Sequence, residues 1–274
     1  MINSRQLSNA LTERFGLGVN AKISQVADGQ KIIIRPNGIE KTISFQIEIK
    51  LGWRTISALF KPGNYASSLI ASMNAAHSEQ KAAFSIFANS LMSKGASIEL
   101  LLDGESVLVH QPDTWSHSWS TFQLSMKKVG VLLEKNSSYD FIETFPWATG
   151  FLGLSLSLLP LEEIPTENRL GENEGAVYYS ISKRYERSRI NRAACIEIHG
   201  TSCKICSHNF EDKFGAHGKG FIHIHHIVPV SEMGSSYALE PALDLIPVCP
   251  NCHAMLHRVN PALKPEDLKE IILK

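Results

Sequence analysis

Side chains able to bind metals or transfer protons gather in the last third of the sequence. His223, His225 and His226 fall within the segment FIHIHHIVPV, and His253 and His257 follow within DLIPVCPNCHAMLH. Histidine changes its charge near neutral pH and is a common metal ligand, so such a cluster is more typical of a site than of an apolar core. The chemistry that these residues suggest is metal binding combined with proton transfer.

The spacing of the histidines separates two roles. Alternate side chains of a strand point to opposite faces, so His225 would face one side and His226 the other. His253 and His257 are four residues apart and share one face of a helix. We therefore expect His225 to complete a three-histidine metal site with open positions for water or a phosphate oxygen. His226 would then be available as a general base.

The cysteines form two close pairs. Cys203 and Cys206, and again Cys249 and Cys252, are spaced C-x-x-C. Paired knuckles of this kind suit one tetrahedral structural Zn²⁺, whereas disulfides require an oxidising compartment. The N-terminus has no apolar segment of signal-peptide length, so we expect a cytoplasmic protein with a structural zinc site. The alternative is four buried free thiols; Cys195 fits neither pair and is expected in the core.

Together these residues resemble the HNH, or ββα-metal, endonuclease family. The resemblance runs from about Tyr178 to Asn260, and its strongest part is HHIVP followed by DLIPVCPNCHAMLH. The most similar pattern is the zinc-knuckle variant found in modification-dependent restriction enzymes and phage-defence nucleases. The resemblance implies hydrolysis of phosphodiester bonds with one catalytic divalent cation, Mg²⁺, Mn²⁺, Ni²⁺ or Zn²⁺. It assigns metal binding to His225, His253 and His257, and the general base to His226.

Three further positions carry open alternatives. Asp244 stands where the family usually has an asparagine; it can accept the same hydrogen bonds but cannot donate, which would either strengthen cation binding or weaken the enzyme. His223 stands where relatives often carry an acid, and is either a partner of a ligand histidine or a surface residue. Arg258 could clamp a phosphate or simply pair with the helix C-terminus.

The elements that would position this site are clearest near the N-terminus. We expect a helix over Asn3–Phe15, strands in KIIIRPNG and TISFQIEIKLGW with a turn between them, and one helix or a helical pair over residues 64–94. A strand at ASIELLLDG and a helix through residues 115–128 would follow. The apolar run 145–161 is interrupted by proline and glycine and falls short of the roughly 20 residues of a membrane span, so it is expected as a buried strand or core helix.

The chain is expected to be α+β, with two domains. Residues 1–165 form a mixed α+β domain that selects a target or senses a signal, residues 166–176 a linker, and residues 177–274 the HNH domain with its zinc site. Lysine plus arginine and aspartate plus glutamate each total 27, so any nucleic-acid surface must be local. One local excess has helical spacing and would be either a solvated helix face or a phosphate contact; it comprises Lys183, Arg184, Arg187, Arg189 and Arg192.

These features favour a metal-dependent DNA endonuclease acting on duplex DNA in restriction or anti-phage defence. A second hypothesis is a catalytically weak, zinc-stabilised module that binds nucleic acid. In a third, the N-terminal domain senses a small molecule or a partner protein and the nuclease is its effector. Paired cuts in duplex DNA would suit a homodimer, and no membrane partner is expected.

Overall fold

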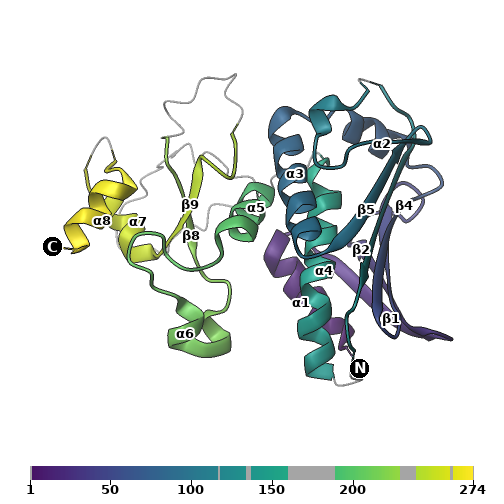
Figure 1. Cartoon of the computed structure of the whole chain (residues 1–274), viewed down its shortest axis with the longest axis horizontal. Helices are drawn as coiled ribbons and strands as arrows, with labels where there is room; N and C mark the ends of the chain where they lie inside the picture. Colours follow the sequence, from purple (N-terminus) through teal and green to yellow (C-terminus); the bar gives the residue numbers. More distant parts are fainter. Residues whose placement is uncertain are drawn as a thin grey trace, which may run out of the picture.

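The computed structural model describes residues 2–116, 118–133, 137–159, 189–228, 239–259 and 262–273. Two groups of elements lie side by side, and helix α5 (Arg189–His199) stands between them (Figure 1). The first group is a sheet covered by helices. The second group is smaller and contains the cysteine pairs and the clustered histidines.

The first group is built on a seven-stranded antiparallel sheet with strand order β1-β2-β3-β4-β7-β5-β6. Strands β1 to β4 follow one another as a meander, and β7 then inserts between β4 and β5. The strands are β1 (Val19–Val26), β2 (Gly29–Pro36), β3 (Phe45–Leu51), β4 (Thr55–Pro62), β5 (Ala96–Leu102), β6 (Glu105–Ser106) and β7 (Phe122–Val129).

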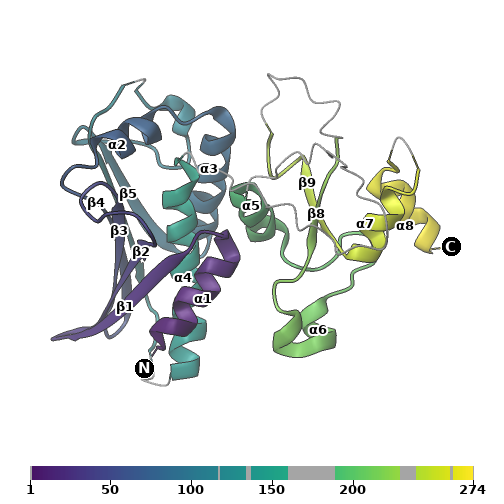
Figure 2. The same ribbon diagram turned by 180° about the vertical axis from the view of Figure 1, so that it is seen from behind.

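Alternation along the strands decides which face of the sheet is buried. In β3, Phe45, Ile47 and Ile49 are buried against the helices, while the residues between them belong to the opposite face. The helices of this group lie on the apolar face and leave the other face open (Figures 1 and 2). They are α1 (Ser4–Phe15), α3 (Ser78–Ser93) and α4 (Ser137–Ser157), with α2 (Ser67–Asn74) and the short 3-10 turn η1 (Pro112–Thr114) at the margin.

Local signals explain where these helices begin and which faces they bury. Asn3 caps α1 by accepting hydrogen bonds from the backbone N–H groups of Arg5 and Gln6. Leu7, Leu11 and Phe15 of α1 are spaced four apart and all three are buried. Helix α4 is apolar on most sides because it lies in the interior, between α3 and the sheet.

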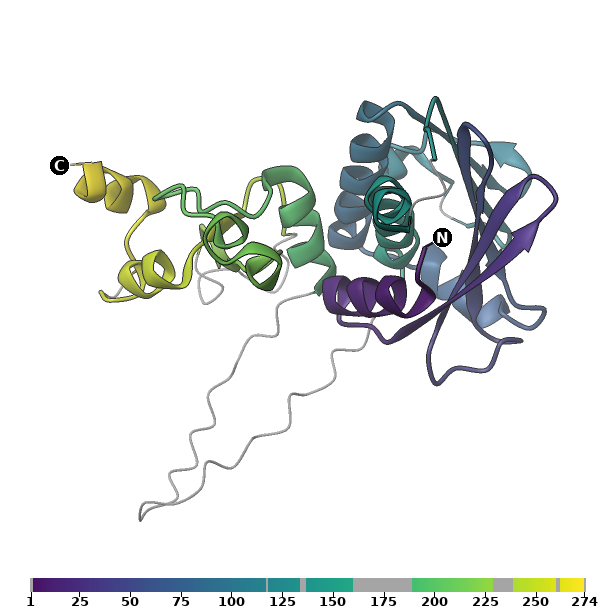
Figure 3. The same ribbon diagram turned by 90° about the horizontal axis from the view of Figure 1, so that it is seen from below.

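The second group is arranged around a two-stranded antiparallel ladder. Strands β8 (His223–His226) and β9 (Leu245–Val248) pair so that His225 lies opposite Ile246, and helix α7 (Pro250–Leu256) follows β9 directly. The remaining elements are α6 (Phe210–Phe214), the 3-10 turn η2 (Gly215–Gly218) and α8 (Pro265–Leu273), seen from below in Figure 3.

Helix α5 belongs to both groups. Its residues Ile190, Ala193 and Ala194 complete the core of the first group, whereas Cys195 and Ile196 belong to the core of the second. The side chain of Glu197 reaches back to the first group, where it pairs with Arg14 at 3.4 Å and Lys94 at 2.5 Å. One helix therefore fixes the second group against the first.

Most of the expected elements are present, and one expectation was wrong. The helical pair, the first helix, the strand at residues 96–102 and the core helix within 145–161 are confirmed. The helix expected through residues 115–128 is instead strand β7, because Phe122, Leu124 and Met126 alternate with outward residues and fill the centre of the sheet. Strands β1 and β4 were not expected. Among the described residues no helix has the length and apolar character needed to cross a membrane.

Candidate functional site

The site is assembled by β8, β9 and α7. Strand β8 supplies His225 and His226, and α7 supplies His253 together with His257, which caps its C-terminal end. Cys249 caps the N-terminus of α7, where its side chain accepts a hydrogen bond from the N–H of Cys252, and Pro250 occupies the first turn. Motif residues from two distant segments thus meet within one ββα unit.

His225, His253 and His257 converge. Each offers one ring nitrogen, and these nitrogens all lie within 4.8 Å of one another. Their ring centroids are 4.9 to 5.5 Å apart. His225 is buried, His253 is partly buried and His257 is exposed, so the cluster opens to solvent on one side. The three nitrogens are close enough for one cation to draw them together, with the exposed side available to further ligands.

His226 lies on the other face of the same strand. It is partly buried and pairs along the ladder with Leu245. The three-histidine cluster comprises His225, His253 and His257, and alternation along a strand places the His226 side chain on the face opposite His225.

His223 lies beside the cluster and contacts one of its members. Its Nδ1 is 3.1 Å from Nδ1 of His253, and the two rings are nearly perpendicular, at 89°. A hydrogen bond at this distance would fix the orientation of the His253 ring. Of the two alternatives for His223, a partner of a ligand histidine agrees better with this geometry than an isolated surface residue.

Asp244 braces the segment that leads into β9. Its carboxylate accepts a hydrogen bond from the N–H of Glu240 at 2.7 Å, and its backbone carbonyl accepts one from the N–H of Ile227 at 2.8 Å. The residue is buried, with 8% of its surface exposed. It thus ties the end of β8 to the start of β9, and its side chain accepts the Glu240 hydrogen bond, which an aspartate can do as well as an asparagine.

The four knuckle cysteines form a second cluster. Their sulfur atoms all lie within 4.8 Å of one another, and Sγ of Cys206 is 3.7 Å from Sγ of Cys249. Tetrahedral zinc with Zn–S bonds of about 2.3 Å separates neighbouring sulfurs by about 3.8 Å. The cysteines therefore fit a structural zinc ion. Cys203 and Cys249 are buried, whereas Cys206 is exposed.

The electrostatics of the knuckles agree with a bound cation. Burial raises the pKa of Cys252, and the neighbouring thiols raise it further. At Cys203 burial also works to raise the pKa, but backbone N–H groups at Cys206 and Cys249 outweigh it and lower the pKa. A divalent cation among the four sulfurs would offset the burial and crowding that oppose ionisation of Cys252.

Cys195 is separate from the knuckles. It is fully buried, and burial raises its pKa to about 12. A thiol of this kind is an inert packing residue, as the sequence indicated.

The basic residues considered as phosphate contacts differ in their surroundings. Arg258 is exposed immediately after His257, while Lys183, Arg184 and Arg187 lie outside the described residues. The other two arginines of the expected basic helix make internal contacts: Arg189 donates to the carbonyl of Gly16, and Arg192 donates to the carbonyl of Ile222 at 2.7 Å. Arg192 therefore holds the segment entering β8, a role that neither of the two alternatives for the basic helix included.

Sequence reasoning missed how α5 positions the ββα unit. Arg192 holds the carbonyl of Ile222 just before β8, and a ring nitrogen of His199 lies 3.1 Å from the carbonyl of Ala242 just before β9. Both strands of the site are therefore tethered to one helix. Neither contact had a signal in the sequence, because the partners are main-chain carbonyls.

Comparison with known proteins identifies the second group. Residues 203–258 match the family model of the HNH endonuclease. This range contains both knuckles, β8, β9 and α7, so the resemblance found in the sequence is confirmed for this part of the chain. No curated protein and no solved structure matches the chain.

Proposed function

We propose, from the HNH endonuclease domain at residues 203–258, that the protein is a metal-dependent endonuclease that hydrolyses phosphodiester bonds in duplex DNA. The observation that carries the proposal is the convergence of three ring nitrogens within 4.8 Å beside a fourth histidine on the opposite face of the strand. Such a set separates cation binding from proton transfer, which is the division of labour that hydrolysis of a phosphodiester requires.

Each residue has a distinct task in this reaction. His225, His253 and His257 hold the cation, which supplies stabilisation of the negative charge that develops on phosphate. His226 accepts the proton of the attacking water, because histidine is a side chain that can serve as a base at physiological pH. Arg258, exposed beside His257, binds a phosphate oxygen. Asp244 positions the start of β9 by holding the N–H of Glu240.

The zinc site and the N-terminal part have supporting roles. Cys203, Cys206, Cys249 and Cys252 hold a structural Zn²⁺ that fixes the N-terminus of α7, and thereby the two ligand histidines on that helix. We further propose the division of the chain into a target-selecting or sensing unit over residues 1–165 and a nuclease unit over residues 177–274, with a linker between them. A reducing, cytoplasmic setting suits free thiolates, and restriction or phage defence suits a nuclease joined to a selecting domain.

The test is cleavage of plasmid DNA by purified protein with Mg²⁺, Mn²⁺, Ni²⁺ or Zn²⁺, using unmodified and methylated substrates. His226→Ala should lower the rate by about 10²- to 10⁴-fold because it removes the general base. His217→Ala is the matched control, since His217 is an exposed histidine of η2 outside the cluster. Equal cleavage by the His226→Ala variant and the control would remove His226 from this role.

The main alternative is a zinc-stabilised module that binds nucleic acid without cutting it. It would bind DNA equally well with and without His226 and would show no metal-dependent cleavage of any substrate. If cleavage does occur, the proportion of plasmid linearised in one event reports whether two copies act together.

A further inference from the structure

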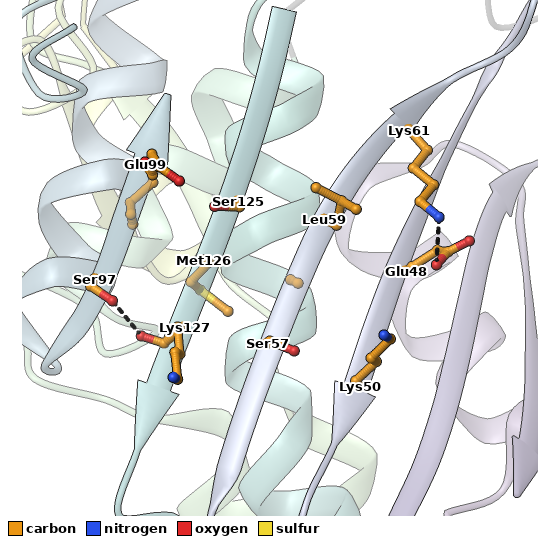
Figure 4. A pocket seen from close by; sticks show the side chains of 12 residues that line it. Glu48, Lys50, Ser57, Leu59, Lys61, Ser97, Glu99, Ser125, Met126 and Lys127 are labelled. Carbon is orange, nitrogen blue, oxygen red and sulfur yellow. Dashed lines mark hydrogen bonds and ion pairs between the residues drawn. The ribbon is translucent and has the colours of Figure 1, made fainter. Parts of the chain in front are cut away.

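One face of the seven-stranded sheet is not covered by any described element. Helices α1, α3 and α4 pack on the opposite face, and the open face carries lysine and serine side chains together with Glu48, Glu99 and Leu59 (Figure 4). It is hollowed into a cavity of about 560 Å³ whose lining includes Lys50, Lys61 and Lys127. The helices lie behind the strands in this view, so these side chains point away from the core.

The strand register arranges part of this face as a continuous row. Cross-strand neighbours in the ladder place three lysines and three serines opposite one another over six strands, without an acid among them. With strands about 4.8 Å apart, the row extends about 24 Å. This lysine–serine row comprises Ser24, Lys31, Lys50, Ser57, Lys127 and Ser97.

The open face as a whole has an excess of positive charge. The outward positions of the paired strands hold six basic and two acidic residues, namely Lys22, Lys31, Arg35, Lys50, Lys61, Lys127, Glu48 and Glu99. The full chain has equal numbers of basic and acidic residues, so this excess is local. It is the local basic surface that composition alone could not locate.

Glu48 neutralises only part of this charge. Its carboxylate lies 3.0 Å from the ammonium groups of both Lys31 and Lys61. Burial works to raise the pKa of Glu48, but the hydrogen bonds from the two lysines outweigh it and lower the pKa, so the carboxylate stays ionised. Within the described part of the chain, Lys50 and Lys127 form no ion pair and remain available to an external anion.

The row places like charges next to each other within the sheet. Lys31 is the direct cross-strand neighbour of Lys50. Like charges in directly opposed positions destabilise a sheet, and a polar neutral residue would fit the same outward position without that repulsion. A ligand with negative charge would offset the repulsion that Glu48 leaves between the two lysines.

We propose that the lysine–serine row binds the phosphate backbone of duplex nucleic acid. Lysine ammonium groups and serine hydroxyls are the side chains that contact phosphate oxygens. The row contains no aromatic residue on which unpaired bases could stack, which favours a duplex over a single strand. Its length of about 24 Å suits a polymer better than a single nucleotide. The inference rests on the proposed function only in taking nucleic acid as the substrate.

The row and the candidate nuclease site lie on opposite sides of the first group of elements. Helix α5 packs on α3 and α4, and the ββα unit lies beyond it (Figures 1 and 3). A sheet with one layer of helices is roughly 20 Å thick, so one short straight duplex cannot occupy both places. The row therefore anchors a stretch of nucleic acid distant from the scissile bond, and its effect should appear only with long substrates.

The test compares two double variants in a His226→Ala background, which prevents cleavage. Lys50→Thr with Lys127→Thr removes two charges from the row, and threonine suits an exposed strand position. Arg5→Ala with Lys81→Ala is the matched control, because it removes two charges from helices on the opposite face. Affinity for a 60-base-pair duplex, measured by fluorescence anisotropy over a series of salt concentrations, is the readout.

The row variant should bind several-fold more weakly than the control and lower the slope of log affinity against log salt by about 2, one for each lost phosphate contact. An unchanged slope would overturn the proposal. Polyglutamate is the competitor: if it displaces the duplex from the control protein as well as an equal charge of unlabelled duplex does, the row takes any polyanion and the assignment to nucleic acid is wrong.

Failure of the nuclease proposal would look different. Hydrolysis of bis(p-nitrophenyl) phosphate by protein with intact His226 needs the candidate site but is too small a reaction to need the row. It should be equal in the row variant and the control. Absence of this hydrolysis in the unaltered protein would count against the nuclease function, while the salt slope would still decide the row.

Discussion

The two groups of elements are held together by different forces. Among the described residues the core of the first group contains 44 buried apolar residues, whereas that of the second contains 12, four of which are cysteines. The first group can rely on burial of apolar surface, whose contribution grows with the size of the core. The second is too small for this, so we expect it to depend on a structural zinc ion and on its attachment to α5.

The largest effect is expected when one of the four knuckle cysteines is replaced. Cys203→Ser should release the structural zinc and unfold the second group, because zinc binding in small domains contributes on the order of 10 kcal/mol to folding. The first group should keep its core. Metal content by mass spectrometry and limited proteolysis would show one zinc ion fewer and cleavage confined to residues after α5.

Cys195→Ala is the matched control, since Cys195 is a buried cysteine of the same core outside the knuckles. It should keep its zinc. A Cys203→Ser protein that is folded and retains zinc would show that the knuckles do not hold the metal.

The corresponding test of the first group is a substitution in its apolar core. Phe87 is fully buried on α3 and lies against the backbone of α4, where a methyl group added at Gly153 would come within 2.5 Å of its ring. Phe87→Ala should lower the free energy of unfolding by about 3–5 kcal/mol through the lost burial and the cavity left behind. Thermal unfolding with and without a chelator should give the same loss. If the loss of unfolding free energy depends on the chelator, the stability of the first group also depends on metal, and the proposed difference between the groups is wrong.

The same difference explains what could be predicted from sequence. The site residues of the second group are close in sequence and chemically specific, so Cys249, Cys252, His253 and His257 identify the family without any knowledge of packing. Their convergence with His225 follows from strand alternation and helix periodicity. The tethering by Arg192 and His199 did not follow, because each contacts a carbonyl whose position depends on the whole fold.

The first group was predicted less well because its signals are periodic and ambiguous. TFQLSMKKV has polar residues that suit a helix face as well as a strand, and only its insertion between β4 and β5 decides for β7. Strand β4 contains Ala58 and Lys61, which are poor strand formers, and is formed because it pairs on both sides. The lysine–serine row was invisible in the sequence because its six members come from six strands.

An intermediate effect is expected at the junction between the groups. Glu197 accepts a hydrogen bond from Ser90 at 2.7 Å and pairs with Lys94 and Arg14. Glu197→Gln should lower the free energy of unfolding by about 1–3 kcal/mol, because it weakens hydrogen bonds to a charged group. Differential scanning calorimetry should then separate one transition into two. A single unaltered transition would show that the apolar contacts of α5 suffice.

The junction should also respond to pH. Burial works to raise the pKa of Glu197, but its hydrogen bonds with Lys94 and Ser90 outweigh it, so the pKa is lowered from 4.5. A carboxyl whose pKa is lower in the folded state stabilises the fold fully above its unfolded pKa, and the stabilisation is lost as the pH falls through the folded pKa. The unaltered protein should therefore lose stability below about pH 4.5 more steeply than Glu197→Gln.

The smallest effect is expected at Asp244. Asp244→Asn keeps an oxygen that can accept from the N–H of Glu240, so it should cost at most about 1 kcal/mol and leave cleavage within a few-fold. Asp244→Ala removes that acceptor, leaves the N–H of Glu240 without this partner, and should cost about 1–2 kcal/mol with a larger loss of cleavage. Thermal unfolding and plasmid cleavage of both variants distinguish two roles of the Asp244 carboxylate, as a hydrogen-bond acceptor and as a negative charge. If asparagine behaves like aspartate, the residue acts by bracing the start of β9 through hydrogen bonds. If asparagine is as harmful as alanine, the negative charge of Asp244 is itself needed, and electrostatics contribute to the second group at this position as well as hydrogen bonding.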